Sequence, residues 1–300
     1  MNMPPFAPGV IDILVPAEQK IPFVFASPHS GSNYPPDFVH ASALDPASLR
    51  KSEDIYVDQI FALVVACGAP LLRALFPRAV LDPNREPYEL DPAMFEETLP
   101  AYVNARSPRV AAGLGTIAKV VANGASIYAG KLRFAEAERR INTFYHPYHR
   151  ALRHLIETTR QRFGCCVVID CHSMPSIGGP MDADPGLQRV DFVLGDCFSL
   201  SCARAFTATA ERTLKAQGYQ VTRNRPYAGG YTTRRYGQPI RRQHALQIEI
   251  NRKLYVDEMT YAPLPELDRL KQNIAALVQA LAAVPGQERV LSAPVRRGMT

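Results

Sequence analysis

The stretch VVIDCHS, residues 167–173, decides how this chain is interpreted. Its three β-branched apolar residues run directly into polar side chains, which is typical of a strand that is buried on both faces and ends at the edge of a parallel sheet. The stretch FVFASPHSG, residues 23–31, has the same form. Ligands of open α/β sheets bind beyond the carboxyl ends of the strands, so His172 and His29 are the first candidates for chemistry.

Apolar runs of strand length alternate with helical stretches over most of the chain. This alternation predicts an α/β fold of three layers, α/β/α, in which a mostly parallel, mixed and twisted sheet carries helices on both faces. The expected strands are 23–26, 70–75, 79–81, 167–169, 191–194, 219–221 and 246–250. The expected helices are 53–66, 131–163, 201–217 and 265–283.

The length of 300 residues and the hydrophobic fraction of 47% suit one large α/β domain, which we expect over residues 1–286. Residues 85–130 are rich in Pro, Gly, Asn and Glu and weakly periodic, so we expect an insertion of loops over the edge of the sheet. The arginines within residues 287–300 stand among Pro, Gly and Ser, which predicts a basic flexible tail.

Composition excludes several classes of protein. No apolar run is long enough to cross a membrane, and the first residues lack the pattern of a secretory signal, so we expect a cytoplasmic protein with no membrane partner. The six cysteines form no CxxC pair and lie mostly in apolar segments, which indicates reduced core residues. The arginines behind the net charge of +6 are dispersed, which argues against nucleic-acid binding and favours a small anionic substrate.

Glu249 lies inside the otherwise apolar stretch LQIEIN. A lone buried carboxylate is costly unless a partner or a metal ion compensates its charge. A catalytic zinc takes three His or carboxylate ligands and keeps one position open for water. His29 and His172 would supply two ligands and an acid of the pair Glu53-Asp54 the third, which leaves Glu249 as the candidate general base.

The pair Glu53-Asp54 has a second interpretation, because it follows Ser52, a good N-cap residue, and the two acids would then only complement a helix dipole. These patterns do not choose between Glu53 and Asp54 as the ligand. Asp170 lies two residues before His172, on the same side of an extended chain, and is a candidate to accept a ring proton from a neighbouring histidine.

Seven segments in order along the chain resemble the N-formylglutamate amidohydrolase family. They are SPHSGSNYP (27–35), SEDIYVDQIF (52–61), LDPNR (81–85), YHPYHRAL (145–152), VVIDCHSMP (167–175), GGYTTRRYG (229–237) and HALQIEINRKLYVDE (244–258). The resemblance implies a phosphorylase/hydrolase-like sheet of the zinc exopeptidase kind, related to zinc carboxypeptidases and zinc amidases. It also implies a bound zinc and hydrolysis of N-formyl-L-glutamate to formate and L-glutamate in histidine catabolism.

Carried onto this chain, the resemblance implies the metal ligands His29, His172 and Asp54, with Asp54 preferred to Glu53. Glu249 matches the catalytic base of the related peptidases by its place on a late strand.

The implied substrate has two carboxylates, which guanidinium groups bind in a bidentate way. Arg85 and Arg234 match the family pattern for this role, and we expect Asn84, Tyr231 and Gly230 to complete the pocket. His149 of the YHPYH motif is a candidate to hydrogen-bond the developing oxyanion or to orient a ligand.

The chain also departs from the family pattern, with Pro83 and Cys171 where the pattern has Leu and Ala. These departures leave the metal centre intact and leave the acyl group and the amino acid open.

A zinc carboxypeptidase or amidase for another N-acylated substrate is one alternative, and a non-catalytic relative that binds a small ligand is another. Other divalent metals suit the same ligands. A nucleophile at Cys171 or Ser173 is disfavoured, because neither lies in a GxSxG turn.

Overall fold

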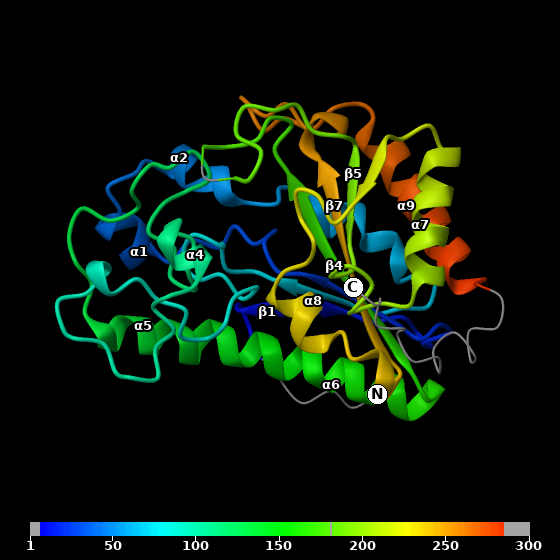
Figure 1. The fold of residues 1–300 in the computed structure, drawn as a ribbon, viewed down its shortest axis with the longest axis horizontal. Coiled ribbons are helices and arrows are strands. Elements are labelled where there is room, and N and C mark those ends of the chain that lie inside the picture. The colour runs from blue at the N-terminus through cyan, green and yellow to red at the C-terminus, as the bar shows by residue number, and fades with distance from the viewer. Residues whose placement is uncertain (1–6, 181, 285–300) are drawn as a thin grey trace, which may run out of the picture.

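The structure is a computed structural model that describes residues 7–180 and 182–284, and the predicted tail at 287–300 lies outside them. Within the described residues, seven strands form one sheet in the order β1-β3-β2-β4-β7-β5-β6 (Figure 1). The strands are β1 (Ile11–Leu14), β2 (Phe23–Ser27), β3 (Leu71–Ala74), β4 (Cys166–Met174), β5 (Phe192–Gly195), β6 (Val221–Arg223) and β7 (Gln243–Asn251).

Four central strands, β3, β2, β4 and β7, run parallel to one another. β1 is antiparallel to β3 at one edge, and β5 and β6 form a parallel pair that runs antiparallel to β7. The carboxyl ends of the four central strands therefore lie side by side, and we call this side of the sheet its carboxyl edge. The arrangement confirms the predicted mixed, mostly parallel sheet.

Helices lie on both sides of the sheet, with α6 along one side and α7 and α9 on the other (Figure 1). The α-helices are α1 (Pro36–Ala41), α2 (Pro46–Leu49), α3 (Val57–Ile60), α4 (Pro108–Ala111), α5 (Phe134–Arg140), α6 (His146–Phe163), α7 (Arg204–Ala216), α8 (Tyr231–Tyr236) and α9 (Leu267–Ala282). The short helical turns are η1 (Arg50–Ser52), η2 (Ala62–Val64), η3 (Pro92–Met94), the π-helical η4 (Ile141–Tyr145), η5 (Pro239–Arg241) and η6 (Arg252–Leu254).

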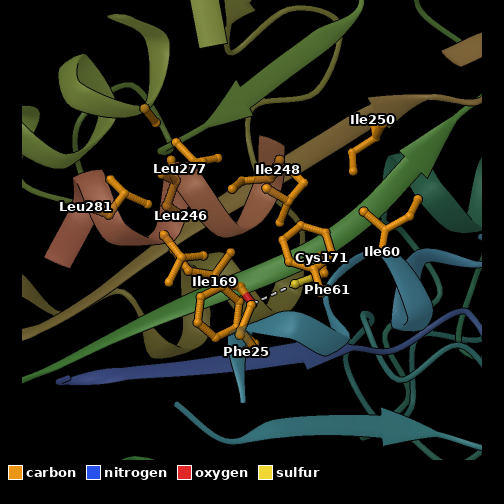
Figure 2. Close-up of a cluster of buried hydrophobic side chains, with 14 of the residues drawn as sticks. Phe25, Ile60, Phe61, Ile169, Cys171, Leu246, Ile248, Ile250, Leu277 and Leu281 are labelled. Atoms are coloured by element: carbon orange, nitrogen blue, oxygen red, sulfur yellow. Dashed lines mark hydrogen bonds between the residues drawn. The ribbon is translucent and has the colours of Figure 1, made fainter. Parts of the chain in front are cut away.

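An apolar cluster lies on each face of the sheet, because strand side chains alternate between the two faces. On one face, Ile169 and Leu246 pack with side chains of α3, α7 and α9, among them Leu277 (Figure 2). On the other face, Val168 and Ala245 pack against α5, η4 and α6. Full burial of one large apolar side chain contributes about 1.5–3 kcal/mol, so the two clusters together fix the strands. The predicted three layers are confirmed.

The predicted helix at 53–66 is wrong, since only the short α3 and η2 form there. Asp54 lies in a loop, where its main-chain N–H donates to the carbonyl of His29 at 2.9 Å. Tyr56 adopts a left-handed conformation with φ of 62°, which ends any helical run. Ser52 caps no helix; its hydroxyl accepts from the N–H of Ala122 at 3.1 Å. The acids of this segment therefore do not open a helix.

Three further element boundaries differ from prediction. Residues 79–81 form a turn rather than a strand, with the N–H of Val80 bonded to the carbonyl of Pro77 at 3.0 Å. β1 was not predicted, and its short IDIL sequence pairs only at the sheet edge. The helix predicted over 131–163 starts at Phe134 and widens into η4 just before Pro147, whose ring and missing N–H disturb regular α-helical bonding.

The 85–130 segment folds mainly as loops, with η3 and α4 its regular elements in the described chain. Figure 1 shows it beside α1 and α2, away from α7 and α9. All six cysteines are free thiols; four are buried as expected, whereas Cys67 and Cys197 are only half-buried. No helix among the described residues has both the length and the apolar character needed to cross a membrane.

Candidate metal centre

Three predicted residues from distant segments meet at the carboxyl edge of the sheet. His29 follows β2, Asp54 precedes α3 and His172 lies on β4. Oδ2 of Asp54 is 3.3 Å from Nδ1 of His29 and 3.0 Å from Nδ1 of His172, and all three side chains are buried. One ligand atom from each residue lies within 4.8 Å of the other two.

The loop that carries His29 is packed against the turn after β3. A Cβ at Gly31 would lie 2.3 Å from the carbonyl oxygen of Phe76, so only glycine allows this close approach. The hydroxyls of Ser27 and Ser30 are hydrogen-bonded at 2.6 Å across the loop. These contacts hold the backbone of the loop that carries His29.

A second carboxylate faces the far nitrogen of each histidine ring. Nε2 of His29 is bonded to Oδ1 of Asp82 at 2.8 Å, and Nε2 of His172 lies 3.1 Å from Oδ1 of Asp170. A carboxylate at this position sets the tautomer and orients a metal-binding histidine. Asp170 was predicted for such a contact, whereas Asp82 was missed, although its place directly after an apolar run is the signal that marks His29 and His172.

The protonation of the cluster follows from its charges. Burial would raise the pKa of Asp54, but hydrogen bonds and charge interactions with His172 and His29 hold it well below its usual range. Burial would lower the pKa of His172, but Asp170 and Asp54 raise it well above its usual value.

The donor set fits a divalent cation of the zinc type. Nδ1 of His29 is buried and has no hydrogen-bond partner, and it faces the same carboxylate oxygen as Nδ1 of His172. Two imidazole nitrogens and one carboxylate oxygen are the ligands of catalytic zinc sites that keep a fourth position open.

The geometry favours Asp54 over Glu53. Oδ1 of Asp54 lies 3.3 Å from both Nη2 of Arg252 and the hydroxyl of Ser173, which leaves Oδ2 facing the histidines. Glu53 accepts instead from the hydroxyl of Tyr34 at 2.7 Å and from Nε of Arg50 at 3.0 Å. Glu53 therefore stays outside the cluster.

Arg252 was missed by the sequence analysis. The signal was present, because Arg252 directly follows β7, and its side chain is buried beside the cluster.

Glu249 stands beside His172 in the β4–β7 ladder, where the two residues are register partners. Its carboxylate is buried, and burial raises its pKa to about 7, although the charge of His172 lowers it. Gln247 donates from Nε2 to Oε1 of Glu249 at 2.7 Å and accepts at Oε1 from the N–H of Gly230 at 2.6 Å. Gln247, which was not predicted, thus joins the Glu249 carboxylate to Gly230, directly before α8.

A cavity opens beside these groups. Its lining includes His29, Asp54, His172 and Glu249, together with the predicted residues Asn84, Arg85 and Gly230.

Asn84 and Gly230 touch closely inside the cavity. A Cβ at Gly230 would lie 2.4 Å from Nδ2 of Asn84, so the glycine is required there. Oδ1 of Asn84 accepts from the N–H of Thr232 at 2.8 Å, while Nδ2 lies 3.2 Å from Asp170. These contacts join the turn after β3, β4 and the start of α8.

Three other predicted residues do not line the cavity. Arg234 is exposed and donates from Nη1 to the carbonyl of Gly229 at 2.9 Å, and Tyr231 packs edge-on against His149. Both ring nitrogens of His149 are bonded, to the hydroxyl of Tyr236 at 2.9 Å and the carbonyl of Pro83 at 2.8 Å. Burial lowers the pKa of His149 to about 4, so the neutral ring supports the turn that carries Asn84.

The fold and the site define a class of protein: an α/β protein whose parallel strands end at a buried His-Asp-His cluster beside a carboxylate, an arrangement suited to one divalent cation. The chain belongs to the N-formylglutamate amidohydrolase family, whose model matches residues 21–256. The resemblance of the seven sequence segments is thereby confirmed.

Individual relatives agree with the family match. The N-formylglutamate deformylase of Pseudomonas aeruginosa is 28% identical over 265 residues, which cover 87% of this chain and 91% of that protein. The N-formylglutamate deformylase of Pseudomonas putida is 26% identical over 243 residues, which cover 80% and 83%.

Solved structures show the same fold. The crystal structure of N-formylglutamate amidohydrolase from Ralstonia eutropha matches with a TM-score of 0.84 at 36% identity, covering 92% of this chain and 98% of that chain. A gene product from Agrobacterium tumefaciens matches with a TM-score of 0.67 at 19% identity, covering 92% and 96%, and shares the fold.

Proposed function

We propose that this protein hydrolyses N-formyl-L-glutamate to formate and L-glutamate, with Zn²⁺ held by His29, Asp54 and His172 and with Glu249 as general base. The observation that carries the proposal is the meeting of these four buried side chains in one cavity, in a chain of the N-formylglutamate amidohydrolase family. The names of the two Pseudomonas relatives and of the Ralstonia structure support the substrate.

The two histidines and Asp54 would hold the cation, with Asp82 and Asp170 orienting the rings. When bound, a divalent cation supplies Lewis-acid chemistry, which lowers the pKa of water and polarises a carbonyl oxygen. Arg252 and Ser173 would keep the Asp54 carboxylate in its present orientation.

Glu249 would take a proton from the attacking water and deliver it to the nitrogen that leaves as the amine of glutamate. Water adds its oxygen to the formyl carbon, the C–N bond breaks, and formate and L-glutamate result. A carboxylate suits this double task when its pKa is raised toward neutrality, as burial does for Glu249. Gln247 would fix one oxygen of that carboxylate and so restrict its rotamer.

The test combines metal analysis with an activity assay. We expect the purified protein to hold one divalent ion per chain, to lose activity with a chelator and to regain it with Zn²⁺. Formate release from N-formyl-L-glutamate is then compared with turnover of N-acetyl, N-succinyl and peptide analogues. Preference for another acyl group would move the protein to the amidase or carboxypeptidase alternative. Metal binding with no turnover of any analogue would indicate a non-catalytic relative.

A further inference from the structure

Four arginines line the cavity. Arg252 is paired with Asp54, and the other three, Arg78, Arg85 and Arg109, differ in how their charges are matched. Arg78 donates from Nε to Oδ2 of Asp82 at 2.9 Å. Arg85 reaches the same oxygen only at 3.6 Å, while its Nε and Nη1 donate to the main-chain carbonyls of Leu114 and Asn84 at 2.8 Å each. Arg109 forms no ion pair with any residue in the described part of the chain.

Arg109 is held at the cavity by the 85–130 segment itself. Its helix, α4, begins after Ser107, whose hydroxyl accepts from the N–H of Val110 at 3.0 Å and donates to the buried carboxylate of Glu89. The carbonyl of Glu89 accepts from the N–H of Thr116 at 2.8 Å, and the carbonyl of Thr116 accepts from the N–H of Asp82 at 2.8 Å. Hydrogen bonds therefore tie α4 to the turn that carries Asp82 and Arg85.

The arginines leave an excess of positive charge on this wall. Burial lowers the pKa of Arg85 to about 10; Asp82 opposes this effect, and the charges of Arg78 and Arg109 add to it. Asp82, which Arg78 and Arg85 share, is also bonded to His29. Like charges held together in a partly enclosed site are relieved when an anion binds, and guanidinium groups match carboxylates geometrically.

We propose that Arg109 binds the side-chain carboxylate of the substrate, so that the inserted segment selects N-acyl derivatives of acidic amino acids, and that Arg85, which the family pattern already gives as a carboxylate-binding residue, takes the α-carboxylate. This inference rests on the proposed function. Arg85 is linked to the metal ligand His29 through Asp82, and the α-carboxylate is attached to the carbon next to the scissile nitrogen. Arg109 lines the same cavity but is exposed, whereas Arg85 is buried, which suits Arg109 to the more distant carboxylate.

The test compares N-formyl-L-glutamate with N-formyl-L-glutamine, which lacks only the side-chain charge. We expect Arg109→Gln to lower kcat/KM for the glutamate derivative roughly 10- to 100-fold, mainly through KM, because one charge-assisted contact is lost. Its kcat/KM for the glutamine derivative should change little. N-formyl-L-isoglutamine lacks the α-carboxylate charge. Its kcat/KM should stay below that of N-formyl-L-glutamate in the Arg109→Gln protein as well, since Arg85 is intact.

Arg106→Gln is the matched control, because Arg106 is exposed in the same segment but does not line the cavity. It should leave kcat/KM unchanged for both the glutamate and the glutamine derivative. Equal losses on the glutamate and glutamine derivatives in Arg109→Gln, or no loss on either, would overturn the proposal.

Calorimetric binding of the two compounds to zinc-loaded Glu249→Gln protein, with and without Arg109→Gln, measures the same preference without turnover. If wild-type protein releases no formate, the proposed function fails. The ratio of the two dissociation constants, with and without Arg109→Gln, still shows whether Arg109 binds the side-chain carboxylate. Absence of binding by both compounds would overturn the subsite as well.

Discussion

The central parallel strands and the 85–130 segment meet at one cavity, but different interactions hold them. β2, β4 and β7 are buried on both faces and bonded to neighbours along their length. The 85–130 segment depends on scattered contacts, such as those of Glu89 with Ser107 and of Thr116 with Glu86. In the proposed enzyme, His172 and Glu249 therefore lie on strands and His29 directly after one, whereas the 85–130 loops decide which substrate enters. Changes in the two regions should then have different kinetic effects.

The largest effect is expected at Asp54. Asp54→Asn removes the charge that balances two histidines and a cation, so we expect loss of the bound metal and of detectable turnover. Elemental analysis and formate release measure both effects. Glu53→Gln is the control, because Glu53 is also buried but is bonded to Tyr34 and Arg50. Retained metal in Asp54→Asn would contradict the assignment.

Glu249→Gln should lower kcat by roughly 100- to 10,000-fold, the usual contribution of a general base, while the metal stays bound. Single-turnover kinetics with elemental analysis of the same sample measure this effect. The matched control is Glu211→Gln, a change on α7 outside the residues that line the cavity, which removes ion pairs with Lys215 and Arg223. A Glu249→Gln protein with wild-type kcat would remove this residue from the mechanism.

Asp82→Asn should weaken metal affinity roughly 10- to 100-fold, because the ring of His29 loses the carboxylate that orients it. Competition with a chromophoric chelator gives the affinity. Unchanged affinity would show that His29 is oriented by its loop alone.

The smallest effect is expected from Ser107→Ala in the 85–130 segment. Loss of the cap of α4 should destabilise this segment by about 1 kcal/mol and raise KM a few-fold with little change in kcat. Steady-state kinetics and thermal unfolding measure the two effects. A fall in kcat without a change in KM would show that the loops also position the reacting groups.

The same contrast explains what could be predicted from the sequence. β2, β4 and β7 were recognisable because residues buried on both faces leave continuous apolar runs, and the polar residues beside them, His29, His172 and Glu249, stand out. The residue patterns alone left Glu53 and Asp54 open, and the resemblance preferred Asp54. The structure brings Asp54 to the two histidines, where its main-chain N–H donates to the carbonyl of His29.

The arginines were the least predictable part of the site. Arg109 lies in a segment without periodicity, and nothing in its neighbourhood in the sequence separates it from Arg106. Arg234 was expected in the pocket on the basis of the resemblance, but α8 turns Thr232 and Thr233 inward and leaves Arg234 exposed. Its role in substrate binding stays a prediction, and so do those of Tyr231 and His149.

His172 and Glu249 are register partners on adjacent strands, so the separation of their backbones, between the proposed ligand and the proposed base, is set by the spacing of a β-sheet, about 4.8 Å. That spacing is among the least adjustable lengths in a protein. Relatives whose loops differ in length or charge would keep the same distance between these two strand positions without any compensating change. The loops around the cavity can therefore vary in sequence toward other N-acyl amino acids while the proposed ligand His172 and the proposed base Glu249 keep their distance.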